Sequence, residues 1–469
     1  MLPLFVMIMT NKHKTRPDTF SRWLLFIMLA SLTLSIPATA QEAEGDTFPP
    51  PGSTGNAANV PHIGGRDPGG NPVRLARKTG HVSNYDESKV KPYVLPNPLK
   101  MADGRVVDSA TRWSDERRNE ILSFYETQIY GRVPNNTPNI QWQAQPNGED
   151  GEKRIEGRIG DQPDGPKIGL TLHLPNEVEG PVPVLLNLSF FSSEAAQARF
   201  LQRSTRNNDR PRFDQRAAVL QHGWAFAQIG YGDIQPDRAD HWREGVIGQT
   251  LSENQERPAA DEWGTISAWA WGASRVIDYL ETVEAIDRKR IALTGASRLG
   301  KTSLWAAAKD SRIAAVLSVV PGEMGASLIR RDWGETLDDM AQNFHWQFAG
   351  NLQNWVGKWE ALPIDQHMLI SLIAPRAVYV NGGLSDQWSD PKGEFLAMVA
   401  AGPVYRLLGA GDLGTDKLPE LDQPIISKSL AFHYHSKGHH SVPEDWQLFL
   451  EFADKHFAAT EKSKGASKE

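Results

Sequence analysis

The sequence predicts an α/β fold in which a doubly wound, mostly parallel central sheet is flanked by helices. Apolar segments alternate with stretches of helical periodicity between residues 114 and 456. Several of these segments are near-continuous hydrophobic runs, which are typical of parallel strands covered on both faces. In the later half of the chain, the order strand–helix–strand indicates the same three-layer sandwich.

The helices and strands can be assigned in order along the chain. A first helix is expected over Asp115–Tyr130, because Ser114 precedes it, acidic residues occupy its first turn and Gly131 follows it. Further helices are expected over Gly264–Leu280 and Pro443–His456. The expected strands are Ile140–Gln143, Arg154–Ile159, Ile168–Leu174, Val182–Leu188, Ala225–Ile229, Arg290–Leu293, Ala314–Val320 and Ala377–Val380.

The composition excludes several classes of function. The 469 residues include 50 Lys and Arg, 57 Asp and Glu, and no Cys. A chain without Cys has no disulfide, no thiolate metal site and no Cys nucleophile. A net charge of −7 gives a chain of this length no general attraction for nucleic acid. We therefore expect a globular protein with no nucleic-acid partner, and the residue pattern requires neither a metal nor another cofactor.

Residues 1–40 have the pattern of a secretory signal peptide. Several basic residues precede the 14-residue apolar run Trp23–Ile36, and Pro37-Ala38-Thr39-Ala40 ends in a small-x-small pattern. The run is short for a membrane span, which needs about 20 residues. We expect cleavage after Ala40 and a secreted or periplasmic protein with no membrane partner after cleavage. An uncleaved membrane anchor is the alternative.

The remaining chain divides into three parts. Residues 41–83 are rich in Gly, Pro and Asn and have no hydrophobic period, which predicts a flexible linker. Residues 84–459 carry the predicted α/β domain. The charged residues 460–469, TEKSKGASKE, predict a disordered tail.

One central stretch fits two kinds of chemistry. Thr294–Thr302, TGASRLGKT, follows a predicted strand and opens a predicted helix, and it matches the phosphate-binding pattern G-x-x-x-x-G-K-[ST]. Three observations weigh against a nucleotide. An exported protein meets little ATP, no downstream strand ends in an Asp suited to Mg²⁺, and the motif comes late among the strands. A P-loop nucleotide-binding protein therefore remains a remote alternative.

The second interpretation of this stretch is a nucleophile elbow, a tight strand-to-helix turn that raises a Ser above the sheet. Ser297 would be that nucleophile, with Gly295 two residues before it. The usual second Gly would stand at position 299, where this chain has Leu299, and Gly300 follows one residue later. The pattern G-x-S-x-x-G is therefore a weaker signal than the common elbow.

A Ser nucleophile needs a His as base and an acid that orients the His. In α/β-hydrolases these residues follow one another in the order Ser, acid, His. Asp386 lies on a loop after the predicted strand Ala377–Val380, and His439 lies in a Gly-containing loop before the last helix. The order Ser297, Asp386, His439 therefore predicts a catalytic triad on an α/β-hydrolase fold.

The residues around the elbow resemble the glucuronoyl esterases of carbohydrate esterase family 15, whose elbow reads G-C/x-S-R-x-G-K. Gly295–Lys301, GASRLGK, matches this pattern. The resemblance spans roughly residues 84–457 and implies an α/β-hydrolase that cleaves the ester joining 4-O-methyl-glucuronate of xylan to lignin alcohols. The other matching stretches are Tyr130–Pro134, Tyr231–Ile234, Ala268–Gly272, Arg330–Thr336, Leu362–His367 and Trp388–Phe395.

The same resemblance implies roles for individual residues. Ser297 would be the nucleophile, His439 the general base, and Arg298 a group that helps to hold the oxyanion. A guanidinium beside the nucleophile can stabilise charge that develops only in the tetrahedral intermediate. The residues implied to bind the sugar are Lys301, Glu335 and Trp388.

Two positions depart from the family pattern. Many members carry the catalytic acid as a Glu after the strand that follows the elbow, where this chain has Val320, and Glu323 lies three residues further on. Asp386 fills the other acid position of the family, so we favour Asp386 as the acid and keep Glu323 as the alternative. The second departure is Asn187–Ser192, NLSFFS, where relatives tend to have a Gly-Asn-His type of loop.

We therefore expect a secreted, monomeric serine esterase that acts through an acyl-enzyme and needs no cofactor. Its partner would be a glucuronoxylan or lignin–carbohydrate ester substrate. Two alternatives stay open. One is an acetylxylan esterase or other carboxylic-ester hydrolase on the same scaffold, and the other is a carbohydrate-binding relative weakened in catalysis by its altered acid position.

Overall fold

The computed structural model describes residues 64–148, 151–176, 179–192 and 213–466, with side chains up to residue 460. The chain separates into two compact units, Met1–Glu42 and Ala43–Glu469, and all described residues belong to the second. The expected signal peptide and the first part of the expected linker lie outside the described residues. Within those residues, no helix has both the length and the apolar character needed to cross a membrane.

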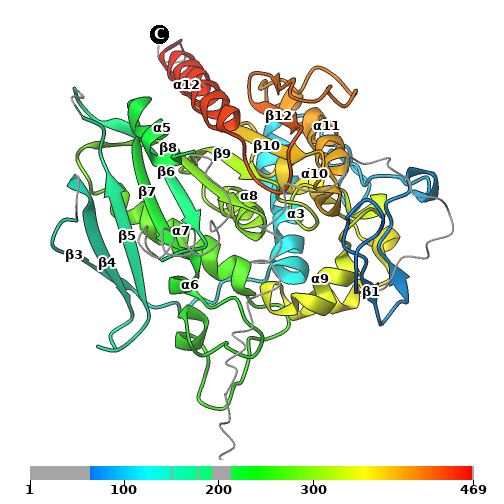
Figure 1. Ribbon diagram of the computed structural model, residues 1–469, viewed down its shortest axis with the longest axis horizontal. Helices are drawn as coiled ribbons and strands as arrows, with labels where there is room; N and C mark the ends of the chain where they lie inside the picture. The colour runs from blue at the N-terminus through cyan, green and yellow to red at the C-terminus, as the bar shows by residue number, and fades with distance from the viewer. Residues whose placement is uncertain (1–63, 149–150, 177–178, 193–212, 467–469) are drawn as a thin grey trace, which may run out of the picture. The chain divides into compact units, whose positions relative to one another are not determined.

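Ten strands form one sheet across the centre of Figure 1. Six of them are parallel neighbours, in the spatial order β7-β6-β8-β9-β10-β12. β5, β4 and β3 extend the sheet antiparallel beyond β7, and β11 pairs antiparallel with β12. The strands are β3 (Ile140–Ala144), β4 (Lys153–Ile159), β5 (Lys167–His173), β6 (Val182–Ser189), β7 (Ala225–Gly230), β8 (Ile286–Ala296), β9 (Ile313–Val319), β10 (Ala377–Gly383), β11 (Ile425–Ile426) and β12 (Leu430–His435).

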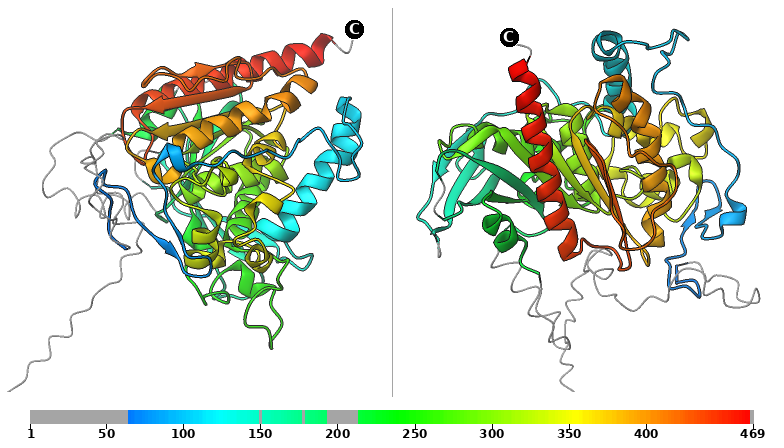
Figure 2. Two further views of the ribbon diagram at one scale, coloured as in Figure 1. Left: turned by 90° about the vertical axis from the view of Figure 1, so that its right-hand side faces the viewer. Right: turned by 90° about the horizontal axis from the view of Figure 1, so that it is seen from above.

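Helices cover both faces of this sheet (Figure 2). On one face α12 packs on α5, β9 and β10, and on the other α7, α8, α10 and α11 pack against one another and the sheet. The mostly parallel sheet between two helical layers is the predicted α/β-hydrolase fold. The helices are α2 (Ala110–Arg112), α3 (Arg118–Phe124), α5 (Gln215–Gln221), α6 (Tyr231–Ile234), α7 (Thr265–Leu280), α8 (Arg298–Lys309), α9 (Leu337–Asn343), α10 (Gln366–Ser371), α11 (Pro391–Leu407) and α12 (Pro443–Ala466).

Short helical turns complete the described structure. Two of them, η2 and η3, are π-helical; η2 joins α2 to α3, and η3 continues the same helix beyond α3. The turns are η1 (Glu87–Lys89), η2 (Trp113–Arg117), η3 (Tyr125–Ile129), η5 (Val246–Gln249), η6 (Ile329–Arg331), η7 (His345–Gln347), η8 (Gly350–Asn354), η9 (Trp359–Ala361) and η10 (Gln387–Ser389).

The central strands are buried along nearly their whole length. Every residue of β7 and β10 is buried, and so are seven of the eight residues of β6. Successive side chains enter opposite cores, so that Val378 and Val380 of β10 belong to one hydrophobic cluster and Tyr379 belongs to the other. The near-continuous apolar runs in the sequence arise from this burial on both faces.

Two helix boundaries differ from those expected. The first helix begins at Ala110 rather than Asp115, because the Ser109 side chain accepts a hydrogen bond from the Arg112 backbone N–H and caps the helix there. At the other end of the chain, α12 continues to Ala466 through the first part of the tail expected to be disordered. That stretch contains Glu461, Lys462 and Lys464, which are residue types that favour helix.

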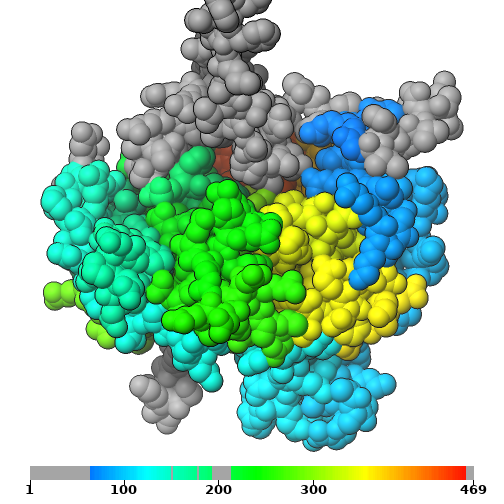
Figure 3. Space-filling model, turned by 90° about the horizontal axis from the view of Figure 1, so that it is seen from below, coloured from blue at the N-terminus to red at the C-terminus, as the bar shows by residue number. Residues whose placement is uncertain are grey.

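Residues 64–83 are also ordered, although the sequence predicted a flexible linker there. These residues belong to Gly64–Lys91, which we call the N-terminal segment. Within it, β1 (Leu75–Ala76) pairs antiparallel with β2 (His81–Val82), and Val73 is 1% exposed. In Figure 3 the segment, in blue, lies beside the yellow region that includes α9. A Gly- and Pro-rich composition shows only that the segment lacks a hydrophobic core of its own. Contacts with the rest of the domain hold the segment in place.

Glu87 anchors the N-terminal segment through charge. Its carboxylate accepts hydrogen bonds from the two terminal nitrogens of Arg331, at 2.8 and 2.6 Å, and from Lys392 Nζ at 2.7 Å. The hydrogen bonds from Arg331 are the main reason why the pKa of Glu87 falls to about 2. Arg331 in turn binds the buried Asp390 at 2.9 Å.

We expect Glu87→Gln to lower the free energy of unfolding by about 1 kcal/mol at pH 7, because the ion pairs of this carboxylate are lost. The loss is no larger because the carboxylate is half-exposed and screened by solvent. The folded pKa lies below the ordinary value of 4.5, so the stabilisation is complete above that pH and disappears as the pH falls towards 2. Urea unfolding of both proteins between pH 2 and pH 7 measures the difference. Glu284→Gln, at an exposed residue with no ion pair among the described residues, is the matched control. A difference that did not change with pH would contradict this account.

Candidate active site

Ser297 lies in the tight turn between β8 and α8. Its backbone angles, φ 57° and ψ −123°, hold a non-Gly residue in a strained conformation. Two glycines make the turn possible. A Cβ on Gly295 would lie 2.6 Å from Leu299 O, and a Cβ on Gly300 would lie 2.8 Å from Val319 O. Gly300 thus allows the close approach of helix and strand, although it stands one residue later than the second glycine of the common pattern.

The same stretch does not form a phosphate-binding loop. Gly295 is part of β8, and the Ser297 backbone N–H donates to Val319 O at 2.8 Å. Lys301 is buried, and its Nζ lies 3.9 Å from Glu335 Oε2. A phosphate site of this type needs successive backbone N–H groups directed at the ligand. The nucleotide-binding interpretation is therefore wrong.

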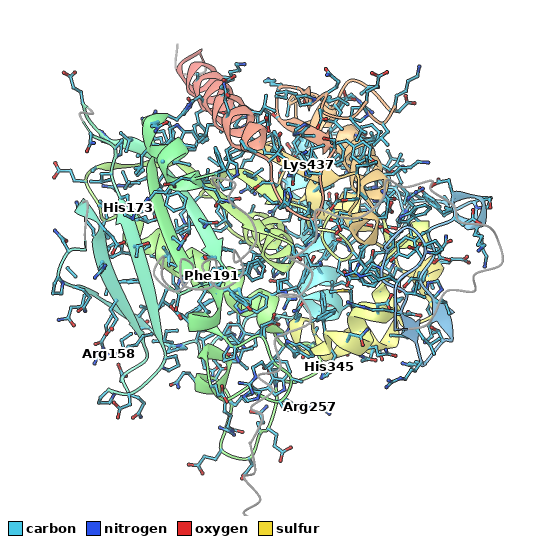
Figure 4. The ribbon with its side chains drawn as sticks, in the orientation of Figure 1. Arg158, His173, Phe191, Arg257, His345 and Lys437 are labelled. Atoms are coloured by element: carbon cyan, nitrogen blue, oxygen red, sulfur yellow. The ribbon has the colours of Figure 1, made fainter. Side chains whose placement is uncertain are left out.

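His439 and Asp386 lie within hydrogen-bonding distance. His439 Nδ1 is 2.7 Å from Asp386 Oδ2, and Ser389 Oγ is 3.3 Å from the same nitrogen. Asp386 follows β10, and His439 lies in the loop after β12, which Lys437 marks in Figure 4. Because these strands are parallel neighbours, their carboxyl ends bring both loops to the edge of the sheet where Ser297 lies.

Backbone contacts fix the two loops to each other. The Leu384 N–H donates to His435 O at 2.9 Å, and the Ser385 N–H donates to Lys437 O at 3.1 Å. A Cβ on Gly383 would lie 2.2 Å from a backbone oxygen of the second loop, so only glycine fits there. The distance between the acid and the imidazole is therefore set by the backbone.

Glu323, the alternative acid, is 2% exposed and makes no hydrogen bond within the described ranges. Burial raises its pKa well above the ordinary value, the negative charges of Asp365 and Glu335 raise it further, and the charge of Lys301 lowers it. Glu323 is therefore a buried carboxyl whose pKa responds to the charge of Lys301. Of the two candidate acids, Asp386 is the one that reaches His439.

Arg298, the residue after Ser297, is buried and forms an ion pair with Asp237. Asp237 also accepts hydrogen bonds from Trp346 Nε1 at 2.7 Å and from the Gln347 side chain at 2.8 Å. Three donors thus converge on one carboxylate and fix the direction of the guanidinium. The Asp237 carboxylate was missed in the sequence because 61 residues separate it from Arg298, although it lies three residues after a matched stretch.

Lys301 and Glu335 lie side by side below the surface. Lys301 is one helical turn after Ser297, whose carbonyl accepts its backbone N–H at 3.0 Å. Burial lowers the pKa of Lys301, and the carboxylate of Glu335 offsets part of this effect. The Glu335 backbone N–H donates to Trp388 O at 2.9 Å, so the three residues expected to bind a sugar are brought together.

Trp388 lies in η10, two residues after Asp386, and is 8% exposed. The Arg74 guanidinium carbon lies 4.3 Å from the centre of the Trp388 ring, and Arg74 Nη1 is 3.8 Å from Glu335 Oε1. Arg74 comes from the N-terminal segment, whose composition predicted a linker rather than part of a site. No local sequence pattern connects it with Trp388.

Asn187–Ser192, the second departure from the family pattern, comprises the end of β6 and the start of the loop after it, which Phe191 marks in Figure 4. The Asn187 side chain donates to the Gln228 side chain of β7 at 3.0 Å. Phe190 is exposed and packs edge-on against Tyr231, with 5.5 Å between ring centres. This loop therefore presents an aromatic side chain to solvent. Among the residues that the structure describes, no group of His, Asp and Glu is arranged to hold a metal ion.

A serine elbow and a His–carboxylate pair at the carboxyl edge of this sheet define an α/β-hydrolase. The comparisons identify the family. The family model described as glucuronyl esterase of fungi matches residues 258–409. Carbohydrate esterase MZ0003, from an unknown prokaryotic organism, is 36% identical over 80% of this chain and 92% of its own. A 4-O-methyl-glucuronoyl methylesterase of Phanerochaete carnosa is 27% identical over 83% of each chain.

Solved structures agree. The glucuronoyl esterase of Solibacter usitatus superimposes with a TM-score of 0.71 at 33% identity, covering 79% of this chain and 100% of its own. A promiscuous esterase of carbohydrate esterase family 15 from a marine bacterial metagenome gives a TM-score of 0.70 at 35% identity, covering 80% and 100%. The chain belongs to carbohydrate esterase family 15, the glucuronoyl esterases, and is a carboxylic ester hydrolase.

The pairing of Lys301 with Glu335 leads to a measurable prediction. We expect Glu335→Gln to lower the pKa of Lys301 further, because it removes the negative charge that most favours the ammonium form. The pKa can be followed by NMR of lysine side chains labelled with ¹³C at Cε, with Lys301→Arg used to assign the signal. Glu284→Gln is the control and should leave the titration unchanged. An unchanged pKa in Glu335→Gln would show that the two side chains are not coupled.

Proposed function

We propose that this glucuronoyl esterase is an exported serine esterase that hydrolyses 4-O-methyl-glucuronoyl esters joining glucuronoxylan to lignin alcohols. The observation that carries the proposal is the 2.7 Å contact between His439 and Asp386 at the edge of the sheet that carries the Ser297 elbow. Membership of the family and the names of its relatives support the substrate class.

In the proposed mechanism, Ser297 attacks the ester carbonyl and His439 accepts its proton. The Nδ1–H of His439 donates to Asp386, which leaves Nε2 as the acceptor that a general base needs. The alcohol leaves with the proton from His439, and water then releases the uronate from Ser297. The ionised Asp386 stabilises the imidazolium that forms on the way.

Glu323 is less suited to this role. Burial favours its protonated form, and a neutral acid cannot stabilise an imidazolium as an ionised carboxylate does. The 2.7 Å contact between His439 and Asp386 also supports Asp386 as the acid.

Charge on the tetrahedral intermediate would be held by Arg298 and by the backbone N–H that follows the nucleophile. Arg298 forms an ion pair with Asp237, whose carboxylate also accepts hydrogen bonds from Trp346 and Gln347. These contacts keep the guanidinium in place before substrate binds. Such preorganised donors need no rearrangement as the oxyanion forms.

The sugar would be held by Lys301, Glu335 and Trp388. A buried ammonium and a buried carboxylate supply a donor and an acceptor for hydroxyl groups, and an indole ring supports the apolar face of a pyranose. We propose no metal or nucleotide in the reaction. The proposed export rests on the signal-like pattern of residues 1–40, with cleavage after Ala40, and the protein would act as a monomer.

A wider range of carboxylic esters is the second candidate. One relative with 35% identity is described as a promiscuous esterase, and the loop after β6 here exposes Phe190 where other alcohol groups could pack. This candidate uses the same nucleophile and base. It predicts turnover of acetylated xylan as well as uronate esters.

The first experiment is hydrolysis of a benzyl glucuronate ester by protein that begins at Gln41, with Ser297→Ala beside it. We expect turnover that falls by at least about 10⁴-fold in Ser297→Ala, because the nucleophile is lost. No turnover by the wild type would refute the uronate ester as substrate. Acetylated xylan would then be tested as substrate, and sugar binding without turnover would indicate a binding protein.

The second experiment decides between the two acids. We expect Asp386→Asn to lower kcat by roughly 10³–10⁴-fold, because the imidazole loses its orientation and its counter-charge. Glu323→Gln keeps the shape of the buried side chain and should change kcat by less than about tenfold. Circular dichroism spectra of both variants control for folding. The opposite pattern, an inactive Glu323→Gln and an active Asp386→Asn, would assign the acid to Glu323.

A further inference from the structure

The N-terminal segment is held firmly against α9 and the chain before it. The Arg77 backbone N–H donates to Gln342 Oε1 at 2.7 Å, and the Thr79 hydroxyl donates to Asp338 Oδ2 at 2.7 Å. Ahead of the helix, the Gly334 N–H donates to Asn84 O at 2.9 Å. The contact in Figure 3 between the blue segment and the yellow region is therefore made by specific hydrogen bonds.

These contacts place Arg74 among the residues proposed to bind the sugar. Its guanidinium lies 4.3 Å from the centre of the Trp388 ring and 3.8 Å from Glu335 Oε1. It also lies 5.8 Å from the Phe344 ring, and the Arg298 guanidinium lies 5.6 Å from that same ring. One phenyl ring thus contacts both Arg74 and the guanidinium next to the nucleophile.

Exposure distinguishes Arg74 from its neighbours. The side chain of Arg74 is 21% exposed, whereas that of Glu335 is 8% exposed and Trp388 is 8% exposed. A ligand that comes from solvent towards the carboxylate and the indole therefore meets the guanidinium. A planar guanidinium carries five N–H donors, which match the oxygen acceptors of sugar hydroxyl groups.

We propose that Arg74 is a substrate-binding residue that donates hydrogen bonds to hydroxyl groups of the glycosyl part of the ester and holds Trp388 and Glu335 for the same purpose. The N-terminal segment then completes the sugar site. This inference rests on the proposed function of Lys301, Glu335 and Trp388. It makes the enzyme select esters of sugar acids over esters that lack a sugar.

The contacts described above join Arg74 to Trp388, Glu335 and Phe344 and not to the reacting groups, so its contribution should be equal in the ground state and the transition state. Uniform binding of this kind appears in KM rather than in kcat. A residue that only supported the fold would instead affect all substrates alike. The comparison of a sugar ester with a small ester separates the two roles.

The test uses Arg74→Ala, Arg74→Lys and Arg77→Ala. Arg77 is the matched control, because it belongs to the same segment, is exposed, and forms no side-chain hydrogen bond or ion pair with the described residues. Benzyl glucuronate is the sugar ester and p-nitrophenyl acetate is the ester without a sugar. In Arg74→Ala we expect KM for benzyl glucuronate to rise about tenfold or more with kcat within about twofold, and p-nitrophenyl acetate hydrolysis to stay unchanged.

Arg74→Lys should fall between wild type and Arg74→Ala, because lysine keeps the charge but lacks the guanidinium that lies over Trp388. Arg77→Ala should behave as wild type with both esters. Equal losses on both esters in Arg74→Ala, or no change on either, would overturn the proposal.

A binding measurement keeps this test separate from that of the proposed function. Methyl glucuronate is titrated by calorimetry into Ser297→Ala protein with and without Arg74→Ala. Weaker binding without Arg74 supports the inference even if the wild type hydrolyses no uronate ester. Unchanged binding, or no binding by either protein, refutes it even if Ser297-dependent turnover is observed.

Discussion

The turn at Ser297 is the constraint on which the other features of the site depend. A strained backbone of this kind costs about 1–3 kcal/mol and persists only where its surroundings hold it. Here Gly295 and Gly300 let α8 approach β8 and β9 closely, and a hydrogen bond to Val319 closes the turn. The first turn of α8 then carries Arg298 and Lys301 in fixed directions. A single local conformation thus positions the proposed nucleophile and two cations.

Buried charges around this turn are matched in pairs. Arg298 pairs with Asp237, and Lys301 lies beside Glu335, each with little contact with water. Burying an ion pair costs desolvation that its attraction recovers only with good geometry, so such pairs are poor sources of stability. They do fix where each charge lies. For a site in which charge develops at one oxygen and hydroxyl groups must be held nearby, position matters more than stability.

Much of the fold could be predicted from local patterns. Strands buried on both faces leave near-continuous apolar runs, and the elbow leaves a Gly–Ser–Gly spacing, so the sheet and Ser297 were recognisable. The acid stayed open between Asp386 and Glu323 because the distance from either carboxyl to His439 depends on which strands are neighbours. Arg74 and Asp237 could not be found, because their contacts join residues far apart in the sequence. The N-terminal segment was taken for a linker because its stability comes from the domain and not from its own composition.

The order of the strands accounts for the proximity of Asp386 to His439. β10 lies directly beside β12, whereas β9 lies one strand further away, and neighbouring strands are about 4.8 Å apart. A carboxylate carried after β10 therefore needs only the short side chain of Asp to reach His439, and backbone hydrogen bonds between the two loops hold it at that distance. After β9 the corresponding position is Val320, fully buried and at φ 39°, an unusual conformation for a β-branched residue. The Val320 N–H donates hydrogen bonds to Asn381 of β10. The end of β9 therefore keeps this unusual backbone conformation, although it carries no acidic side chain there. With no carboxyl at that position, the proposal that Asp386 is the acid rests on the loop after β10, whose backbone hydrogen bonds hold Asp386 next to His439.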